Sequence, residues 1–425
     1  MRTKVMIRRQ VVLSSVVGGL MLLASAGVGR ADIVADQSGA ILIFPKIIVD
    51  TSGVFGPPTD TILQITNTSN SVISGHCFVV DTTPRCLGID EEHPESTACT
   101  PRGEADGDMR CEPGRPCVPQ WNYVADFQFT LTKRQPIAWK ASDGLLSFPC
   151  GGPVVDPNNP GGCQFGSNVS SNGSPSSIPP IPDDPFFGEI KCVQVNPDEL
   201  GQPSAGVSDG NGRGGDLSGH GTIVSVVQEE SGPIDARKYN AIAIQSRGIN
   251  NGDSTLQIGG ELAEYNGCPH TLTLQHLYDG AEVNYDGGNS TAFTDLTLLS
   301  CSQDFNTADT RPATIQLLTF NEFEQRFSAS IRLDCWTEVQ ISDLVNRPGS
   351  SDDAFSIFNI GVQGTLAGQT RIRPVASNGR ANGVLGIAEE FWHRDGNGVT
   401  KSGAYQLNIS GSSELGDQII LSPNF

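Results

Sequence analysis

The segment Asp126-Phe-Gln-Phe-Thr-Leu131 alternates strictly between polar and apolar side chains. Successive side chains of a β-strand point to opposite faces, so its phenylalanines and leucine would share one face and its polar residues the other. Ile331-Arg-Leu-Asp-Cys335 follows the same pattern, with Ile331, Leu333 and Cys335 on one face. Alternation of this kind is typical of antiparallel strands that are buried on one side.

Many further segments have the length and composition of short strands. They are separated by turn residues, and the chain holds 49 Gly and 27 Pro but almost no stretch with helical periodicity. The predicted fold class is therefore all-β, with two immunoglobulin-like antiparallel β-sandwich domains and long loop insertions. The further candidate strands are residues 40–44, 47–49, 61–66, 77–80, 190–195, 222–227, 240–244, 255–258, 271–274, 296–299, 314–320, 355–360, 370–372 and 405–409.

A faint internal repeat sets the predicted domain boundaries. Thr61-Ile-Leu-Gln-Ile-Thr66 in the first half matches Thr314-Ile-Gln-Leu-Leu-Thr319 in the second, and later motifs return in the same order. The repeat places a first sandwich at residues 38–230, connecting strands at 233–292 and a second sandwich at 293–425. Short matches between threonine-rich strands also arise by chance, which is the alternative explanation.

In outline, this pattern resembles the immunoglobulin-like sandwiches of bacterial surface and pilus-associated proteins. The resemblance rests on strand pattern and strand count, so it implies a fold and transfers no functional residue. Residues 81–121 interrupt the pattern with a Cys-rich insertion that is poor in apolar residues, and residues 150–185 and 196–221 are rich in Gly, Pro, Ser and Asn. We expect cross-links to order the first segment, and the other two to be loops, in part disordered.

Residues 1–31 have the features of an export signal. Basic residues precede an uncharged stretch from Gln10 to Gly29, and small residues allow cleavage after Ala26 or Ala31. The signal fits the general secretory route or, through an arginine pair, the twin-arginine route. We therefore expect an exported protein, periplasmic, surface-located or extracellular, whose partners include neither nucleotides nor nucleic acid.

The charge of the chain supports the same exclusions. The predicted signal holds five of the 27 Lys and Arg and none of the 47 Asp and Glu, so the remaining chain carries a formal charge of 22 minus 47, or -25. Such a chain repels nucleic acid and anionic lipid headgroups. After Gly29 no apolar run approaches the ~20 residues of a membrane helix, so we expect no membrane span in the mature chain.

The cysteines favour disulfides over a zinc site. All 11 follow the predicted signal, and the closest pair, Cys111 and Cys117, is wider than the spacing of zinc ligands. Within the core-poor insertion we expect local pairing, in one of three connectivities. The predicted local groups are Cys86, Cys99, Cys111 and Cys117 among themselves, and Cys150 with Cys163.

Long-range disulfides are expected between strands. Cys77 and Cys192 lie on separate candidate strands at inward-facing positions, as do Cys301 and Cys335 in the second half. This pairing leaves Cys268 over, because the cysteine count is odd. Each bridge would stabilise the fold by about 2 to 4 kcal/mol.

Asp209, Asn211 and Asp216 supply two carboxylates and an amide in a glycine-rich segment. Oxygen ligands in a flexible loop are typical of calcium sites. An EF-hand would need an acid or amide in place of Arg213 and a glutamate in place of His220, so that motif is excluded. The segment therefore predicts either a calcium site of another class or ordinary turn residues, and calcium is the one cofactor that the sequence suggests.

Other candidate sites lack the context that their chemistry needs. Gly206-Val-Ser-Asp-Gly210 matches a nucleophile elbow but is not flanked by a strand and a helix. His270 and His276, near Cys268, would stand ~20 Å apart on a strand, too far to share a metal ion. Glu389, Glu390 and His393 follow a candidate strand and fit an acidic loop end better than a metal or catalytic site. The aromatic segment 320–327 fits a hairpin loop, and its alternative interpretation is a binding patch.

No catalytic motif remains with its required context, so the sequence predicts no enzyme activity. We expect an exported envelope or extracellular protein with a binding or structural role, whose partner is a protein or a glycan. The alternative is a secreted, carbohydrate-active hydrolase on the same scaffold. Glycoside hydrolysis needs two carboxylates across a cleft, which 47 acidic residues neither support nor exclude.

Overall fold

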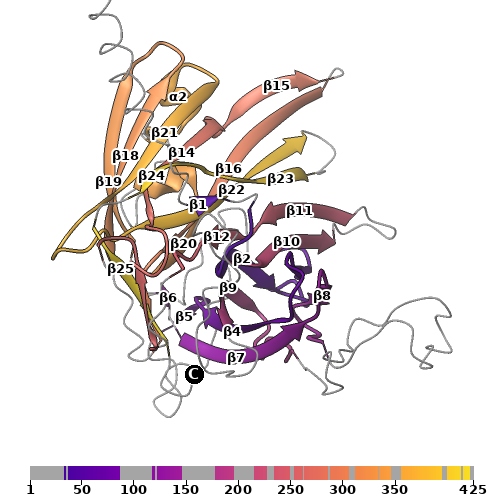
Figure 1. The fold of residues 1–425 in the computed structure, drawn as a ribbon. Coiled ribbons are helices and arrows are strands. Elements are labelled where there is room, and N and C mark those ends of the chain that lie inside the picture. The colour runs from indigo at the N-terminus through magenta and orange to yellow at the C-terminus, as the bar shows by residue number, and fades with distance from the viewer. Residues whose placement is uncertain are drawn as a thin grey trace, which may run out of the picture. The chain divides into compact units, whose positions relative to one another are not determined.

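Strand segments dominate the computed structural model of the chain (Figure 1). In the described part, two short helical segments accompany them: a 3₁₀-helix, η1, at Ile341–Val345 and a helix, α2, at Ile360–Gln363. The structure describes residues 33–34, 37–86, 117–119, 122–145, 178–195, 215–226, 234–248, 253–261, 263–285, 288–305, 312–333, 335–345, 356–394, 400–412 and 415–421.

Two sheets are built from residues 33–244, and all their neighbouring strands are antiparallel. The larger has the spatial order β1 (Ile33–Val34), β12 (Ile242–Ile244), β2 (Ile41–Val49), β9 (Phe186–Val195), β4 (Ile73–Asp81) and β7 (Asn122–Leu131). The smaller has the order β11 (Ile234–Asn240), β10 (Leu217–Val226), β3 (Thr59–Asn67) and β8 (Pro136–Lys140).

Three more sheets come from later residues. The first has the order β13 (Thr255–Ile258), β25 (Asp417–Ile420) and β17 (Gln303–Asp304). The second has the order β19 (Arg326–Leu333), β18 (Ala313–Asn321), β21 (Ala367–Val375), β14 (Pro269–Leu277) and β24 (Asn408–Ser412). The third has the order β15 (Ala281–Tyr285), β16 (Gly288–Ser300), β22 (Val384–Arg394) and β23 (Thr400–Gln406), and β20 (Trp336–Gln340) also pairs with β16. A separate pair joins β5 (Pro84–Cys86) to β6 (Cys117–Pro119).

These sheets confirm the all-β class and correct the predicted arrangement. Within the described residues, the five sheets of three or more strands are arranged as a five-bladed β-propeller and not as two immunoglobulin-like sandwiches. The blades are irregular, because they hold three to six strands and many neighbours are remote in the sequence. Alternation identifies a strand and its buried face, but it does not say to which sheet the strand belongs. The domain boundaries around residues 233–292 stay a prediction.

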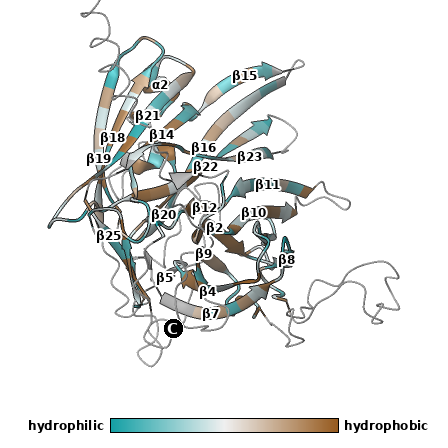
Figure 2. Ribbon diagram, in the orientation of Figure 1, coloured by the Kyte–Doolittle hydropathy of each residue, from teal (hydrophilic) through white to brown (hydrophobic). Residues whose placement is uncertain are grey.

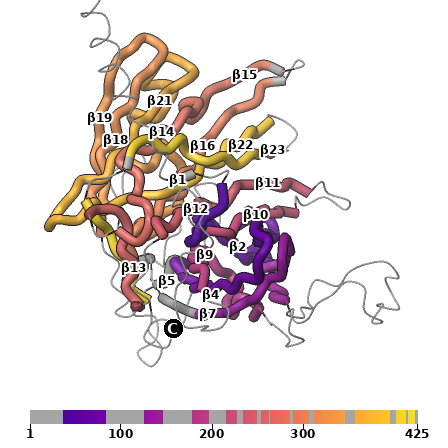
Figure 3. Tube along the Cα trace, viewed as in Figure 1, coloured from indigo at the N-terminus to yellow at the C-terminus, as the bar shows by residue number. Residues whose placement is uncertain are grey.

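Strand β2 lies inside the largest sheet, between β12 and β9 (Figure 3). All nine of its residues are buried, and its apolar members are coloured brown in Figure 2. A strand that is buried throughout must be covered on both faces of its sheet. Lys46 is the single charged residue of this strand, and a buried charge requires a partner of opposite sign.

A second apolar core joins β14, β16, β18 and β21. Leu272, Leu298, Ile315 and Ile372 belong to this cluster and are at most 1 % exposed. Alternate residues of β18 face it, so the residues between them face outward. The sheet that contains β18 therefore has one apolar face and one polar face.

The two alternating segments that predicted strands have different outcomes. Phe127, Phe129 and Leu131 are buried on β7, as the alternation predicts. Strand β19 ends at Leu333, so the expected strand at residues 331–335 is shorter than predicted. Cys335 comes after the end of β19 and just before β20, so it is not part of the strand that holds Ile331 and Leu333.

The disulfide between Cys77 and Cys192 is present, as predicted. The two residues are register partners on the neighbouring strands β4 and β9. Cys86 and Cys117 are likewise register partners of β5 and β6, but their side chains lie outside the described residues. The predicted local bridges therefore stay predictions, since the other members also lie outside: Cys99, Cys111, Cys150 and Cys163.

The predicted bridge between Cys301 and Cys335 is wrong, because Cys301 is bonded to Cys268. The backbone explains the error. The N–H of Ser300 donates to the carbonyl of Cys335 at 2.9 Å, so Cys335 lies across from Ser300 rather than from Cys301. Consecutive side chains of a strand point to opposite faces, so the position opposite Ser300 points to the other face from Cys301. Cys335 is therefore not placed to form a disulfide with Cys301.

Residues 1–31, the predicted export signal, lie outside the described residues. In the part of the chain that the structure describes, no helix has the length and apolar character needed to cross a membrane. Disulfides are typical of proteins in oxidising, exported compartments, and the two described here agree with export.

Candidate functional site

Lys46 lies in a β-bulge that interrupts the regular pairing of β2 with β9. The register of β2 against β9 shifts at Pro45-Lys46. Proline cannot donate to a strand ladder, so a bulge is one of the few places where a strand tolerates it. Two other strands bind the bulge: the indole N–H of Trp336 donates to the carbonyl of Pro45 at 2.8 Å, and the hydroxyl of Tyr239 donates to the carbonyl of Lys46.

The ammonium of Lys46 forms ion pairs with two carboxylates. They belong to Glu338 on β20 and Glu389 on β22. The side chains of Lys46 and Glu389 are each 1 % exposed, so both charges are removed from water. Strands from residues 41–49 and 336–394 are therefore joined by buried charges as well as by apolar contacts.

Arg237 on β11 is the second cation of this cluster. Its Nε lies 2.7 Å from Glu389 Oε1, and a terminal nitrogen lies 3.4 Å from Asp235 Oδ2. Ser402 on β23 donates its hydroxyl to the same Asp235 oxygen. The guanidinium also lies over the ring of Phe391, 5.2 Å from the ring centre, in a cation–π contact.

The charged partners keep Lys46 and Glu389 ionised despite burial. Burial lowers the pKa of Lys46, but the carboxylates of Glu338, Glu389 and Asp295 outweigh it, and the pKa lies above its usual range. Burial raises the pKa of Glu389, but the charges of Lys46 and Arg237 outweigh that effect and lower it. We refer to Lys46, Arg237, Asp235, Glu338 and Glu389 as the charge network.

Asp295 on β16 is a further carboxylate beside the charge network. Burial raises the pKa of Asp295 to about 7, and the neighbouring carboxylates of Glu338, Glu389 and Asp279 act in the same direction, against Lys46. Burial is the largest cause of the shift, and the network itself already holds three carboxylates against two cations. A further positive charge nearby would therefore be stabilised.

Replacing Asp295 with asparagine should stabilise the chain increasingly as pH rises. The folded pKa of Asp295 lies above the unfolded one, so the folded state binds more protons and loses stability as pH rises from about 4 to about 7. The asparagine side chain would stay neutral at every pH. The gain over the unaltered chain should grow by about 2 to 3 kcal/mol between pH 5 and pH 8 in urea unfolding. A gain that is constant over this range would contradict the assignment.

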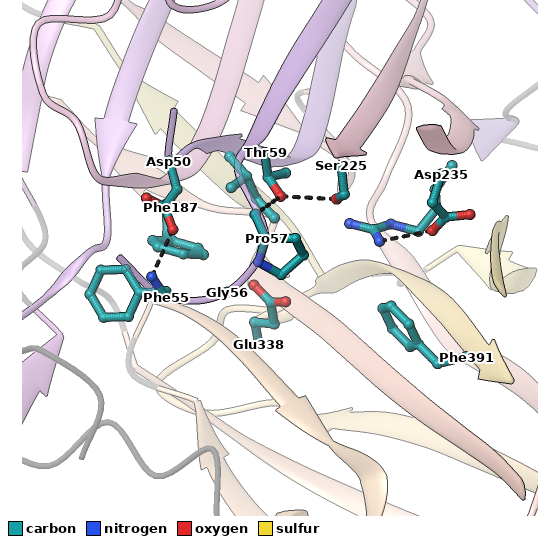
Figure 4. A pocket seen from close by; sticks show the side chains of 12 residues that line it. Asp50, Phe55, Gly56, Pro57, Thr59, Phe187, Ser225, Asp235, Glu338 and Phe391 are labelled. Atoms are coloured by element: carbon teal, nitrogen blue, oxygen red, sulfur yellow. Dashed lines mark hydrogen bonds and ion pairs between the residues drawn. The ribbon is translucent and has the colours of Figure 1, made fainter. Parts of the chain in front are cut away.

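A pocket of about 300 Å³ opens beside the charge network (Figure 4). Its apolar walls include Phe55 and Phe187, whose rings meet edge to face at 5.2 Å, and Phe391. The polar part of the lining has three carboxylates and one guanidinium. The lining residues are Ile48, Asp50, Phe55, Gly56, Pro57, Thr59, Phe187, Ser225, Asp235, Arg237, Glu338 and Phe391.

The polar groups of the pocket form hydrogen bonds with other groups of the protein. The two carboxylate oxygens of Asp50 accept the N–H groups of Val54 and Phe55 at 2.7 and 2.8 Å. The hydroxyls of Ser225 and Thr59 lie 2.9 Å apart. The pocket is therefore preformed, with fixed charges and aromatic walls.

The structure leaves the predicted calcium site untested. Asp209 and Asn211 lie outside the described residues. Asp216 is buried, its carboxylate accepts the side-chain amide of Gln194 at 3.0 Å, and its N–H donates to the amide oxygen of Gln194 at 2.9 Å. The elbow serine, Ser208, also lies outside the described residues.

His276 and Cys268, two members of the candidate metal group, are engaged within the fold. His276 is 4 % exposed, and one ring nitrogen lies 2.9 Å from the hydroxyl of Thr370. Burial lowers the pKa of His276 to about 4, so its ring is neutral at neutral pH. His270 is exposed, and Cys268 is in a disulfide.

The acidic pair at 389–390 lies within strand β22, so its assignment to a loop end is wrong. Glu389 faces the core and belongs to the charge network, whereas the neighbouring Glu390 accepts the indole N–H of Trp392 at 2.6 Å. The aromatic segment 320–327 spans the hairpin turn between β18 and β19, together with the adjoining strand ends, as the hairpin interpretation predicts.

Sequence reasoning missed Lys46 and Arg237. A signal was present for each. Lys46 follows a proline inside an otherwise apolar segment, Ile41–Val49, which is unusual for a strand that is buried throughout. In Ile234–Asn240 the alternation places Asp235 and Arg237 on one face, and the structure buries that face.

Comparison with known proteins adds no assignment to this site. No family model matches the chain, and no curated protein is significantly similar to it. The function is therefore argued from the pocket and the charge network.

Proposed function

We propose that this chain is an exported, non-catalytic binding protein of the cell envelope or the extracellular space, and that its pocket takes a small ligand with a positively charged group. The observation that carries the proposal is the lining of the pocket. Three phenylalanine rings line it together with the carboxylates of Asp50, Asp235 and Glu338, against the single cation of Arg237.

Both parts of that lining favour an organic cation. Aromatic faces attract cations through their quadrupole, and the attraction is larger where water is excluded. The excess of carboxylates attracts the same ligand and repels anions. A volume of about 300 Å³ is at the lower end for ligand pockets, so a compact ligand fits it best.

A binding role is supported over catalysis by how the polar groups are engaged. A serine nucleophile needs a general base, whereas Ser225 is paired with the hydroxyl of Thr59. Asp235 is held by Arg237 and Ser402, and Glu338 by Lys46. The rival function, a carbohydrate-active hydrolase, would need two of these carboxylates to exchange protons with substrate and water.

Titration calorimetry with three probes of matched shape tests the proposal. Benzylammonium, benzyl alcohol and benzoate share an aromatic body and differ in charge. We expect benzylammonium to bind most tightly and benzoate least. Phe391→Leu keeps an apolar side chain but removes the ring, so it should weaken benzylammonium about fivefold and leave benzyl alcohol nearly unchanged.

The matched control is Phe323→Leu, which changes a phenylalanine that is 68 % exposed and does not line the pocket. It should leave all three affinities unchanged. Benzoate binding as tightly as benzylammonium would contradict the proposed charge selectivity. Release of nitrophenol from nitrophenyl glycosides, lost in Glu338→Gln, would favour the hydrolase instead.

A further inference from the structure

We propose that the outer face of the sheet β19-β18-β21-β14-β24 binds an anionic polysaccharide. This inference goes beyond the proposed function, because the face does not contribute to the pocket. It rests on the register of the five strands, on the charge of the residues that face outward, and on the composition of the surface around them.

The register brings four arginines to one face. On β18 the buried residues Ile315 and Leu317 point to the core, so Thr314, Gln316 and Leu318 point outward. Opposite residues of antiparallel neighbours share a face. The partners of these outward positions include Arg332 on β19 and, on β21, Arg373 opposite Gln316 and Arg371 opposite Leu318; Arg326 lies opposite Phe320.

All four arginines are exposed, and the other outward positions hold mostly polar uncharged residues, with the half-buried Leu318, Phe320 and Val375 among them. The residues that continue the rows are Ser328 and Ser330 on β19, Gln369 on β21, Thr273 and Gln275 on β14, and Asn408 on β24. None of the outward-facing residues of these five described strands is acidic. The whole chain, in contrast, holds 47 Asp and Glu against 27 Lys and Arg.

This composition matches an anionic polysaccharide. Guanidinium groups bind carboxylates with two parallel hydrogen bonds, and amide and hydroxyl side chains are suited to sugar hydroxyls. Arg371 lies over the ring of Phe320, 5.4 Å from its centre, so the cation is held against the sheet beside an aromatic surface. In Figure 2, teal hydrophilic segments recur along β18, β19 and β21.

The dimensions of the face, and the absence of large exposed apolar side chains from the outward positions of these described strands, favour a polymer of sugars over a protein. Five strands at ~4.8 Å spacing form a face roughly 20 Å wide, long enough for several sugar units. Protein interfaces usually have a core of large apolar side chains. The exposed large apolar residues of the described chain, such as Phe323 and Leu366, lie outside the outward positions of these strands.

Binding of polygalacturonate, a polymer of carboxylated sugars, tests the inference by affinity electrophoresis and biolayer interferometry. We expect the protein to bind polygalacturonate and not neutral dextran, with an affinity that falls as salt increases. Arg371→Gln combined with Arg373→Gln should weaken binding roughly tenfold, because it removes two of the four guanidiniums.

The matched control is Lys133→Gln combined with Arg134→Gln. It removes the same charge from two exposed residues between β7 and β8 and should leave binding unchanged. Equal weakening by both pairs would show attraction by diffuse charge and overturn the inference. Polyglutamate that binds as tightly as polygalacturonate would indicate an acidic protein partner. DNA that binds more tightly than polygalacturonate would indicate a nucleic acid. Either result would also overturn the inference.

The test is independent of the proposed pocket function. Phe391→Leu should leave polygalacturonate binding unchanged, and the arginine pair should leave benzylammonium binding unchanged. Unaltered melting temperatures of the variants would establish that losses of binding do not come from unfolding. Failure of one proposal is therefore distinguishable from failure of the other.

Discussion

Replacing Lys46 with methionine should lower the free energy of unfolding by about 3 to 5 kcal/mol at pH 7. Methionine has an unbranched side chain like the apolar part of lysine, so the substitution mainly removes the positive charge. Glu389, which is 1 % exposed, would then lose one of its two cationic partners, and Glu338 would lose its ion pair. Urea unfolding at constant salt measures the difference.

An exposed lysine supplies the matched control. Lys140 is 36 % exposed and pairs with Asp143 at 3.2 Å, so Lys140→Met should cost no more than about 1 kcal/mol. The double variant Lys46→Met, Glu389→Gln should lower the free energy of unfolding by less than the sum of the two single variants. In the double variant both charges of the buried ion pair are removed together, so neither stays buried without the other. Equal costs for Lys46→Met and Lys140→Met would show that the network contributes little to folding.

Removal of the disulfide between Cys268 and Cys301 should be nearly as costly. The two residues are separated by 33 positions, and closing a loop of that length restricts the unfolded chain by an amount worth about 4 kcal/mol in the chain-entropy account. We expect Cys268→Ala combined with Cys301→Ala to lower the unfolding free energy by approximately that amount under oxidising conditions.

Cys335→Ala distinguishes this pairing from the one that the sequence suggested. Cys335 is buried, so its loss should cost at most about 1 kcal/mol through packing. If Cys335→Ala were as destabilising as the double variant, the bridge would involve Cys335. Peptide mapping without reduction should yield one cross-linked species that joins the peptides of Cys268 and Cys301.

The sequence predicts single strands well where one face is buried. On β7 the alternation of Phe127 and Phe129 with polar residues identifies the strand and its inner face. It fails where a bulge interrupts the strand. Residues 40–44 and 47–49 predict two strands, but β2 is one strand with Pro45 and Lys46 in a bulge.

The arrangement of the sheets and the site could not be predicted from these patterns. Lys46 and Glu389 are 343 residues apart, and a pattern within one segment holds no information about a partner at that distance. The sequence predicts Glu389 at a loop end, because an acidic pair is usually solvated. Only the pairing of β22 with β16 and β23 shows that one of the two acids is buried.

A crystal structure of the protein soaked with benzylammonium would show whether the pocket selects an organic cation. We expect the aromatic ring of the probe in the pocket against Phe391, with its ammonium within hydrogen-bonding distance of the carboxylate of Glu338 or Asp235. Benzoate soaked at the same concentration should leave the pocket without bound probe. Benzoate in the pocket with its carboxylate on Arg237, or benzylammonium bound only elsewhere on the protein, would show that the pocket does not select cations.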